Sequence, residues 1–406
     1  MELGAGFRRL WWATATSDAG SAIGYGALPL VAVLTLHAST AEVSLLAAVS
    51  ASAGALIAVP SGAAVEFRRK RPVMVAADIV RFAALTSVAV ATALHVVTMA
   101  QLYAVSVIQT AALVTFQAAS GAHLRSLVPK EKRAEALSRL DTSSWTANAL
   151  GPPIGGTLVS AVGPALTLAI DAVSYLASVL GVSRIRQPEP PPPARKANNG
   201  KEIVAGWRYL LGDRALRLLF ANALLFGSSM LMVVPLETVL MLNVLHVTPW
   251  QYGLVVGLPC LGGVLGARLS PRLVRRFGLR RVLLGAGIAR TPWLLAIPLA
   301  TPGLGGLILL MATSFGLLLC AGVFNPVFTA HRMAMTREDM MSRVLAGWSV
   351  GGRLTQPLFI AAGGALATVT SLRTAIAVAG ILCVTSIPFL LRSGGRSRVS
   401  VRTRTR

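Results

Sequence analysis

The sequence predicts an all-α polytopic membrane protein with twelve transmembrane helices in two six-helix halves and both termini in the cytoplasm. Of its 406 residues, 54% are hydrophobic and only 13% are charged, whereas a soluble domain has about 25% charged residues. The apolar residues occur in stretches long enough to cross a bilayer, and the positive charge occurs in every second loop between them. Such high hydrophobicity also excludes an intrinsically disordered chain.

Twelve apolar stretches meet the length of about 20 residues that a helix needs to cross the hydrocarbon core. None of them alternates apolar and polar residues, as the strands of a membrane barrel would. The first stretch is expected to be retained as a helix, because its apolar run is longer than the core of a signal peptide. The stretches are 10–36, 42–65, 73–96, 101–125, 139–162, 164–184, 216–242, 250–271, 279–300, 304–329, 344–367 and 373–392.

The net charge of +23 comes from 38 Lys and Arg residues against 15 Asp and Glu residues. These basic residues gather at 8–9, 68–71, 130–133, 184–201, 272–281, 332–343 and 396–406. No Lys or Arg occurs in the alternate loops, which are 37–41, 97–100, 162–163, 243–249, 301–303 and 368–372. Positive loops stay in the cytoplasm, so we expect a multi-pass protein of the cell inner or plasma membrane with cytoplasmic termini. Because orientation explains the charge, no nucleic-acid partner is expected.

Composition divides the chain into four parts. The proline run after position 187 is typical of a stiff, polyproline-like linker. The basic amphipathic segment 202–211 suits the inner membrane surface. The expected parts are an N-terminal six-helix half at 1–186, a cytoplasmic Pro-rich linker and amphipathic segment at 187–214, a C-terminal six-helix half at 215–393 and a basic cytoplasmic tail at 394–406.

The two halves carry related elements at matching places. A glycine followed by a basic cluster joins the second and third stretches of each half, at 62–71 and at 266–281. Six plus six helices with a repeated cytoplasmic turn and a long central loop resemble the major facilitator superfamily, whose halves are parallel repeats. The resemblance implies a secondary transporter that needs no cofactor and is not an enzyme.

Several motifs resemble the siderophore and macrolide exporter branch of that superfamily. They are Gly151-Pro152-Pro153-Ile154-Gly155-Gly156, Ile170-Asp171-Ala172-Val173-Ser174-Tyr175, Gly206-Trp207-Arg208-Tyr209-Leu210, Arg343-Val344 and Ser371-Leu372-Arg373-Thr374. The chain departs from the branch pattern at Glu66-Phe67, Ala118-Ala119-Ser120 and Ala147. The resemblance implies efflux by an antiporter, and the predominance of Arg over Lys is typical of a high-GC bacterial genome.

Asp18 is the first candidate for proton coupling, because an ionisable group inside a span is costly and points to a function. It lies about 12 Å into the first stretch at 1.5 Å per residue, next to Ser17 and ahead of Gly20 and Gly24. By the resemblance, the first helix lines the central cavity, so Asp18 would face water and substrate. The alternative is a hydrogen bond to a neighbouring helix.

Other polar residues within the spans are candidates to bind substrate. Glu237, just after Pro235, is either a second coupling carboxylate or a group that reaches the external interface. Arg290 is expected to pair with another helix rather than to bind a ligand. The uncharged candidates, each of which could instead form a packing bond between helices, are Gln109, Gln117, Asn222 and Asn325.

By the resemblance, the first basic turn forms a cytoplasmic gate whose acidic residue faces the start of the eleventh helix, where the helix dipole favours it. The alternative is a solvated charge run. The glycines of the fifth stretch are expected to allow close packing and rocking of helices rather than binding. The gate residues are Gly62, Glu66, Arg69, Lys70, Arg71, Asp78 and Arg81, and those of the exporter-type motif are Gly151, Pro152, Gly155 and Gly156.

Other chemistry has no support in the sequence. No nucleotide-binding loop precedes Lys201 at the required spacing, and the histidines show no metal-ligand spacing. Cys260, Cys320 and Cys383 all lie in spans, so no disulfide framework is expected. The predicted function is therefore proton-coupled efflux of a small amphipathic drug, antibiotic or siderophore-like molecule by a monomer in the lipid bilayer. The alternatives are an importer of the same fold and a non-transporting sensor or scaffold.

Overall fold

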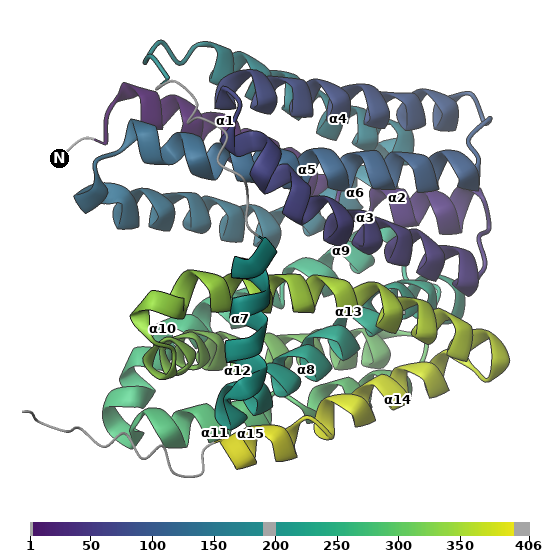
Figure 1. Ribbon diagram of the computed structural model, residues 1–406. Helices are drawn as coiled ribbons and strands as arrows, with labels where there is room; N and C mark the ends of the chain where they lie inside the picture. Colours follow the sequence, from purple (N-terminus) through teal and green to yellow (C-terminus); the bar gives the residue numbers. More distant parts are fainter. Residues whose placement is uncertain (1–2, 190–199, 394–406) are drawn as a thin grey trace, which may run out of the picture.

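The computed structural model describes residues 3–189 and 200–393, and every regular element in these ranges is a helix (Figure 1). The central proline run from 190 and the basic tail from 394 lie outside the described residues. The main helices are α1 Ala5–Ile23, α2 Ala27–Leu30, α3 Thr40–Glu66, α4 Lys70–Ala93, α5 Met99–Leu127, α6 Arg133–Ser183, α7 Gly200–Gly212, α8 Arg214–Val239, α9 Pro249–Gly257, α10 Cys260–Phe277, α11 Leu279–Ala289, α12 Leu304–Met335, α13 Met341–Val369, α14 Leu372–Val384 and α15 Ile387–Ser393.

In the described part of the chain, ten helical segments are long and apolar enough to cross a membrane. One of them, Lys130–Ser183, contains two of the expected spans, because the chain turns at Gly163 inside α6. Gly163 has a φ of 83°, a conformation that glycine adopts without steric cost. Helix α13 has 29 residues but is not among the ten. The protein thus has about ten to twelve apolar helices, and the number of twelve stays a prediction.

Local features of the first half recur 209 positions later in the second half. This 209-residue displacement relates Val31 to Leu240 and His37 to His246. Five-residue π-helical turns, η1 Val31–Thr35 and η3 Leu240–Val244, follow α2 and α8. After each turn comes a histidine with a φ of 51°. The next helix then starts at a capping box, formed by Ser39 with Glu42 and by Thr248 with Gln251. The repeat is therefore structural as well as a pattern in the sequence.

Figure 1 shows α1, α3, α4, α5 and α6 packed in one group and α8, α12, α13 and α14 in another. The groups meet where α3 packs on α13 and where α6 packs on α9. Glycines allow the close approach: the Cα of Gly364 on α13 faces Ser44 on α3, and Gly156 on α6 faces Gly253 on α9. Both contact lines depend on small residues, as is common between membrane helices.

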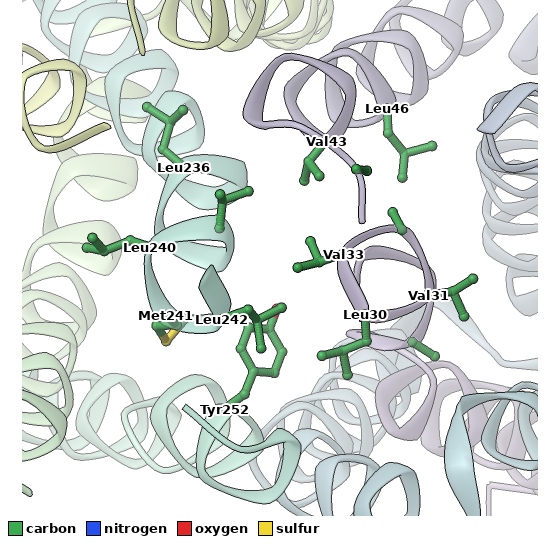
Figure 2. Packing of buried hydrophobic residues seen from close by; sticks show 14 of the residues in the cluster. Leu30, Val31, Val33, Val43, Leu46, Leu236, Leu240, Met241, Leu242 and Tyr252 are labelled. Atoms are coloured by element: carbon green, nitrogen blue, oxygen red, sulfur yellow. The ribbon is translucent and has the colours of Figure 1, made fainter. Parts of the chain in front are cut away.

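Apolar side chains lie between the groups at the end where α2 and α8 run into their π-turns (Figure 2). Leu30, Val33, Val43 and Leu242 point toward one another there, and each is at most 5% exposed. We call these four residues the apolar plug. Tyr252 belongs to the same buried cluster as these four residues.

The expected amphipathic segment forms helix α7, which packs against the second group of helices. The Trp207 ring meets Phe220 of α8 edge to face at a centroid distance of 5.7 Å. Phe220 in turn contacts Trp348 of α13. Gly206 lies against the backbone of Arg343, so α7 is held to α8 and α13 by aromatic and glycine contacts.

Candidate functional site

A cavity of about 310 Å³ adjoins the apolar plug. Met241 and Tyr252 connect the two, because they line the cavity and lie in the buried cluster that includes the plug. Residues from both groups of helices form its wall, with Tyr25 and Trp145 from the first group and Trp293 from the second. Its volume is at the lower end of the range of about 300–1,000 Å³ that is usual for small-molecule sites.

Glu237 is the charged residue among the described residues that line this cavity. It lies on α8 two positions after Pro235, inside the helix. Its half-buried carboxylate forms no ion pair with a described residue. The structure thus places Glu237 in the wall of a cavity, and its role in coupling stays a prediction.

Arg81 lies at the centre of a buried polar network in the first group of helices. The Arg81 side chain is 4% exposed and lies 3.6 Å from the Asp78 carboxylate, which is fully buried. It donates to the hydroxyls of Ser21 and Tyr175, each at 3.0 Å, and its guanidinium stacks on the Tyr175 ring at 4.0 Å. Three helices, α1, α4 and α6, therefore converge on one guanidinium.

Asp18 and Asp171 add two further carboxylates to the same network. Ser144 of α6 donates a hydrogen bond to the Asp18 carboxylate, and both aspartates lie within electrostatic reach of Arg81. Asp171 packs against Gly24 at the end of α1, and a side chain at this position would overlap the Asp171 carboxylate. Asp18 thus lies in a network of charges rather than in the wall of the Glu237 cavity.

Arg290, directly after α11, stands at the position that the 209-residue displacement makes equivalent to Arg81. The Arg290 guanidinium lies between the rings of Phe226 and Phe324, at 3.8 and 3.7 Å, and donates to Asn222 at 3.0 Å. Gly287 stands where the first half has Asp78, and Phe324 packs against it. The charged cluster with carboxylates is therefore confined to the first of the two repeats, within the described residues.

The four uncharged candidates have different surroundings. Gln109 accepts from Arg81 and donates to the Arg81 carbonyl at 2.8 Å, so it belongs to the Arg81 network. Asn222 is buried, accepts from Arg290 and donates to the Ser386 carbonyl, so its amide is occupied by packing bonds. Gln117 and Asn325 are exposed on α5 and α12, and neither lines the Glu237 cavity.

The structure separates the predicted gate residues into two places. Lys70 caps the end of α3 by donating to the carbonyls of Val65, Glu66 and Arg68, and the backbone of Gly62 lies in α3. The exposed Glu66 carboxylate forms no ion pair with a described residue, and exposed Arg69 precedes α4. Asp78 and Arg81 lie about 12 and 16 Å further along α4. Their assignment to the turn was wrong in position, because helical spacing carries them into the network with Asp18.

Glu189, which the sequence did not single out, lies at the start of α4 near the end of the first described range. Its carboxylate accepts from the backbone N–H groups of Lys70 at 3.0 Å and Arg71 at 2.6 Å. It also lies 3.9 Å from the Arg71 guanidinium and 3.5 Å from Nδ1 of His123 on α5. A carboxylate at a helix N-terminus is stabilising, so Glu189 attaches the chain after α6 to α4 and α5.

We expect Glu189→Gln to lower the apparent melting temperature of the purified protein. The side chain of Glu189 is 7% exposed, and hydrogen bonds to a charged group contribute about 1.5–3 kcal/mol each. Light scattering or intrinsic fluorescence during heating in detergent measures the change. Glu131→Gln, at an exposed glutamate, is the matched control. An unchanged melting temperature in Glu189→Gln would contradict this role.

The exporter-type motif of α6 lies at the crossing of three helices. Gly151 and Gly155 face the backbone of Ala22 and Ile23 at the end of α1, and Gly156 faces Pro249 and Gly253 of α9. At Gly155, a Cβ would overlap the Ile23 carbonyl oxygen. Pro152 lines the Glu237 cavity and its carbonyl faces Gly253. The motif therefore brings the two groups of helices together beside the cavity.

Metal chemistry has no candidate site in residues 3–189 and 200–393, where no three His, Cys, Asp or Glu side chains gather to hold an ion. The titratable groups gather instead around Arg81.

Comparison with solved structures identifies the fold. The nucleoside transporter NupG superposes with a TM-score of 0.74 at 12% identity, over 98% of this chain and all of that one. A bacterial homologue of the human lysosomal transporter Spinster, in an inward-facing and unoccupied conformation, gives a TM-score of 0.65 at 14% identity, over 96% of this chain and 94% of that one. At these identities the likeness concerns the fold.

Comparison of sequences gives the family. An uncharacterized MFS-type transporter, YfmI of Bacillus subtilis (strain 168), is 24% identical over 173 residues, which are 40% of this chain and 41% of that relative. The chain thus matches less than half the length of this relative. The family model described as Major Facilitator Superfamily matches residues 10–318 and 238–405. The chain belongs to the Major Facilitator Superfamily.

Proposed function

We propose that the protein is a secondary active antiporter that exports a small amphipathic molecule in exchange for protons. In this proposal twelve helices form two six-helix halves in the cell membrane, with both termini in the cytoplasm. The observation that carries the proposal is the cavity lined by residues of both groups of helices, which shares a buried apolar cluster with the apolar plug. A central site that is sealed on one side is what transport by alternating access requires.

Closure on one side and opening on the other needs two helix contacts that can rearrange. The contacts of α3 with α13 and of α6 with α9 supply them, since both run across the boundary between the groups through glycines. Rocking of one group against the other would separate the plug residues while the opposite ends approach. Efflux as the direction rests on the exporter-type motif at the crossing of α1, α6 and α9.

Proton coupling is assigned to Asp18 within the Arg81 network. The Asp78 carboxylate pairs with the Arg81 guanidinium and two more carboxylates lie within its electrostatic reach, so the excess negative charge is costly in a buried site. A proton on Asp18 would bring the cluster closer to neutrality and weaken the attraction of α1 to Arg81 on α4. Because Asp18 also bonds to Ser144 of α6, its charge affects the packing of the helix that carries the exporter-type motif.

Transport in inverted membrane vesicles tests this function. With ethidium as a fluorescent amphipathic probe, we expect accumulation when the vesicle interior is acidified, and collapse of the accumulation when a protonophore is added. Vesicles from cells without the protein are the control. A flux that persists after the pH gradient and the membrane potential are abolished would contradict active transport, and accumulation by right-side-out vesicles alone would indicate import.

A further inference from the structure

The cavity next to the apolar plug combines one carboxylate with aromatic rings and contains no basic side chain among its described lining residues. We propose that its ligand is a compact organic cation, a quaternary ammonium or protonated amine attached to an apolar body. The site is the one proposed above for transport, so this inference names the substrate class of that function.

Charge is the first argument. Glu237 has no cationic partner among the described residues, and the residues around it in the cavity wall are largely apolar, such as Val233, Met241 and Leu317. An unpaired carboxylate in such a wall is costly. A cationic ligand supplies the missing counter-charge, whereas an anionic ligand would add a second negative charge to a cavity that has no guanidinium or ammonium to meet it.

The aromatic rings give the second argument. Tyr25, Trp145, Tyr252 and Trp293 line the same cavity, and they come from both groups of helices. Aromatic faces attract cations that lie within about 6 Å of the ring centroid, and cages of such rings bind quaternary ammonium ligands. A neutral apolar ligand would bury against these rings too, but it would gain nothing from Glu237.

Three polar side chains of the wall give the third argument, because they already donate hydrogen bonds within their own helices. Thr238 donates to the Val234 carbonyl and Thr313 to the Leu309 carbonyl of its own helix. The Asn148 amide donates to the carbonyl of Ser144. These three donors are therefore not free to replace the hydrogen bonds to water that a ligand with many hydroxyl groups would lose. A cation with an apolar body loses little on entering this cavity.

Binding of a matched pair of compounds to the purified full-length protein in lipid nanodiscs tests this proposal. The cation is naphthylmethyl-trimethylammonium, and its neutral isostere has a carbon in place of the ammonium nitrogen. We expect equilibrium dialysis to show binding of the cation at least about tenfold tighter than that of the isostere, which corresponds to about 1.4 kcal/mol. Equal affinities for the two compounds would overturn the proposal.

Two variants assign the preference to the cavity. Glu237→Gln keeps the shape of the side chain and should reduce the cation preference to near unity, whereas Glu135→Gln, at an exposed glutamate outside the cavity, should leave it unchanged. Trp145→Leu changes a side chain that is 54% exposed and should weaken binding of the cation more than that of the isostere. It provides a second test if Glu237→Gln fails to fold. A cation preference that survives both cavity variants would contradict the proposal.

The same preparation separates the two proposals, because dialysis requires no gradient. Selective cation binding that depends on Glu237 supports the cation site even if the protein transports nothing. Gradient-driven export of neutral compounds without any preference for cations overturns the cation site and leaves the transport function standing.

Discussion

Asp18→Asn is expected to reduce pH-gradient-driven accumulation in inverted vesicles nearly to the level of vesicles without the protein. The substitution removes the negative charge that interacts with Arg81 and that can take up a proton. It keeps a side chain of the same size beside Ser144. Initial rates under an imposed pH gradient measure the effect.

Exchange of labelled for unlabelled substrate distinguishes a coupling role from a structural one. This exchange requires the conformational change but no net proton movement, so it should persist in Asp18→Asn. The matched control is Asp141→Asn, because Asp141 is an exposed aspartate one turn before Ser144 on α6. Normal gradient-driven accumulation by Asp18→Asn would remove Asp18 from the mechanism.

Arg81→Met is expected to abolish the folded protein or reduce its yield severely. The change leaves the carboxylates of Asp78, Asp18 and Asp171 without their shared counter-charge, and breaking a buried ion pair by removing one partner costs about 3–5 kcal/mol. Arg290→Met, at the equivalent position of the second repeat, leaves no described carboxylate unpaired and frees the Asn222 amide oxygen. Its yield should therefore fall much less.

Size-exclusion chromatography of the two variants in mild detergent measures this difference. A double variant, Arg81→Met with Asp78→Asn, removes one of the uncompensated charges and should recover part of the folded protein. If Arg81→Met and Arg290→Met were equally stable, the three carboxylates would not depend on Arg81, and the description of the network would be wrong.

Local features of the fold were predictable from the sequence, because they depend on neighbouring residues. The apolar stretches marked the long helices, and the predicted loop at 162–163 coincides with the turn at Gly163 within α6. Glycines in the exporter-type motif indicated close packing, and the structure places Gly155 against the α1 backbone. The placement of Glu237 in the wall of a cavity was one of two alternatives that the sequence left open.

Long-range pairing was not predictable, because the position of a residue along a helix does not say which helix its side chain will meet. Arg81 follows a basic turn in the sequence, yet it donates to Ser21 and Tyr175 on two other helices. Glu189 stands beside a proline run, and nothing local indicated that it would bond to α4. The sequence offered only the position of this carboxylate, shortly after the end of a predicted span, and that position does not name a partner helix.

In the proposed mechanism, the two groups of helices open alternately at their two ends. Double spin labels at Ala41 and Asn243 report the end with the apolar plug, and labels at Arg68 and Arg276 report the opposite end. All four residues are exposed near helix ends. The native cysteines are first replaced by serine, so that only the introduced sites carry labels. Double electron–electron resonance spectroscopy in nanodiscs, at acidic and at alkaline pH, then measures both distances.

Alternating access predicts opposite changes in the Ala41–Asn243 and Arg68–Arg276 distances. In the conformation described here the plug is closed, so conditions that lengthen the Ala41–Asn243 distance should shorten the Arg68–Arg276 distance. Two distances that stay fixed, or that lengthen together, while the same preparation transports substrate would contradict alternating access by these two groups of helices.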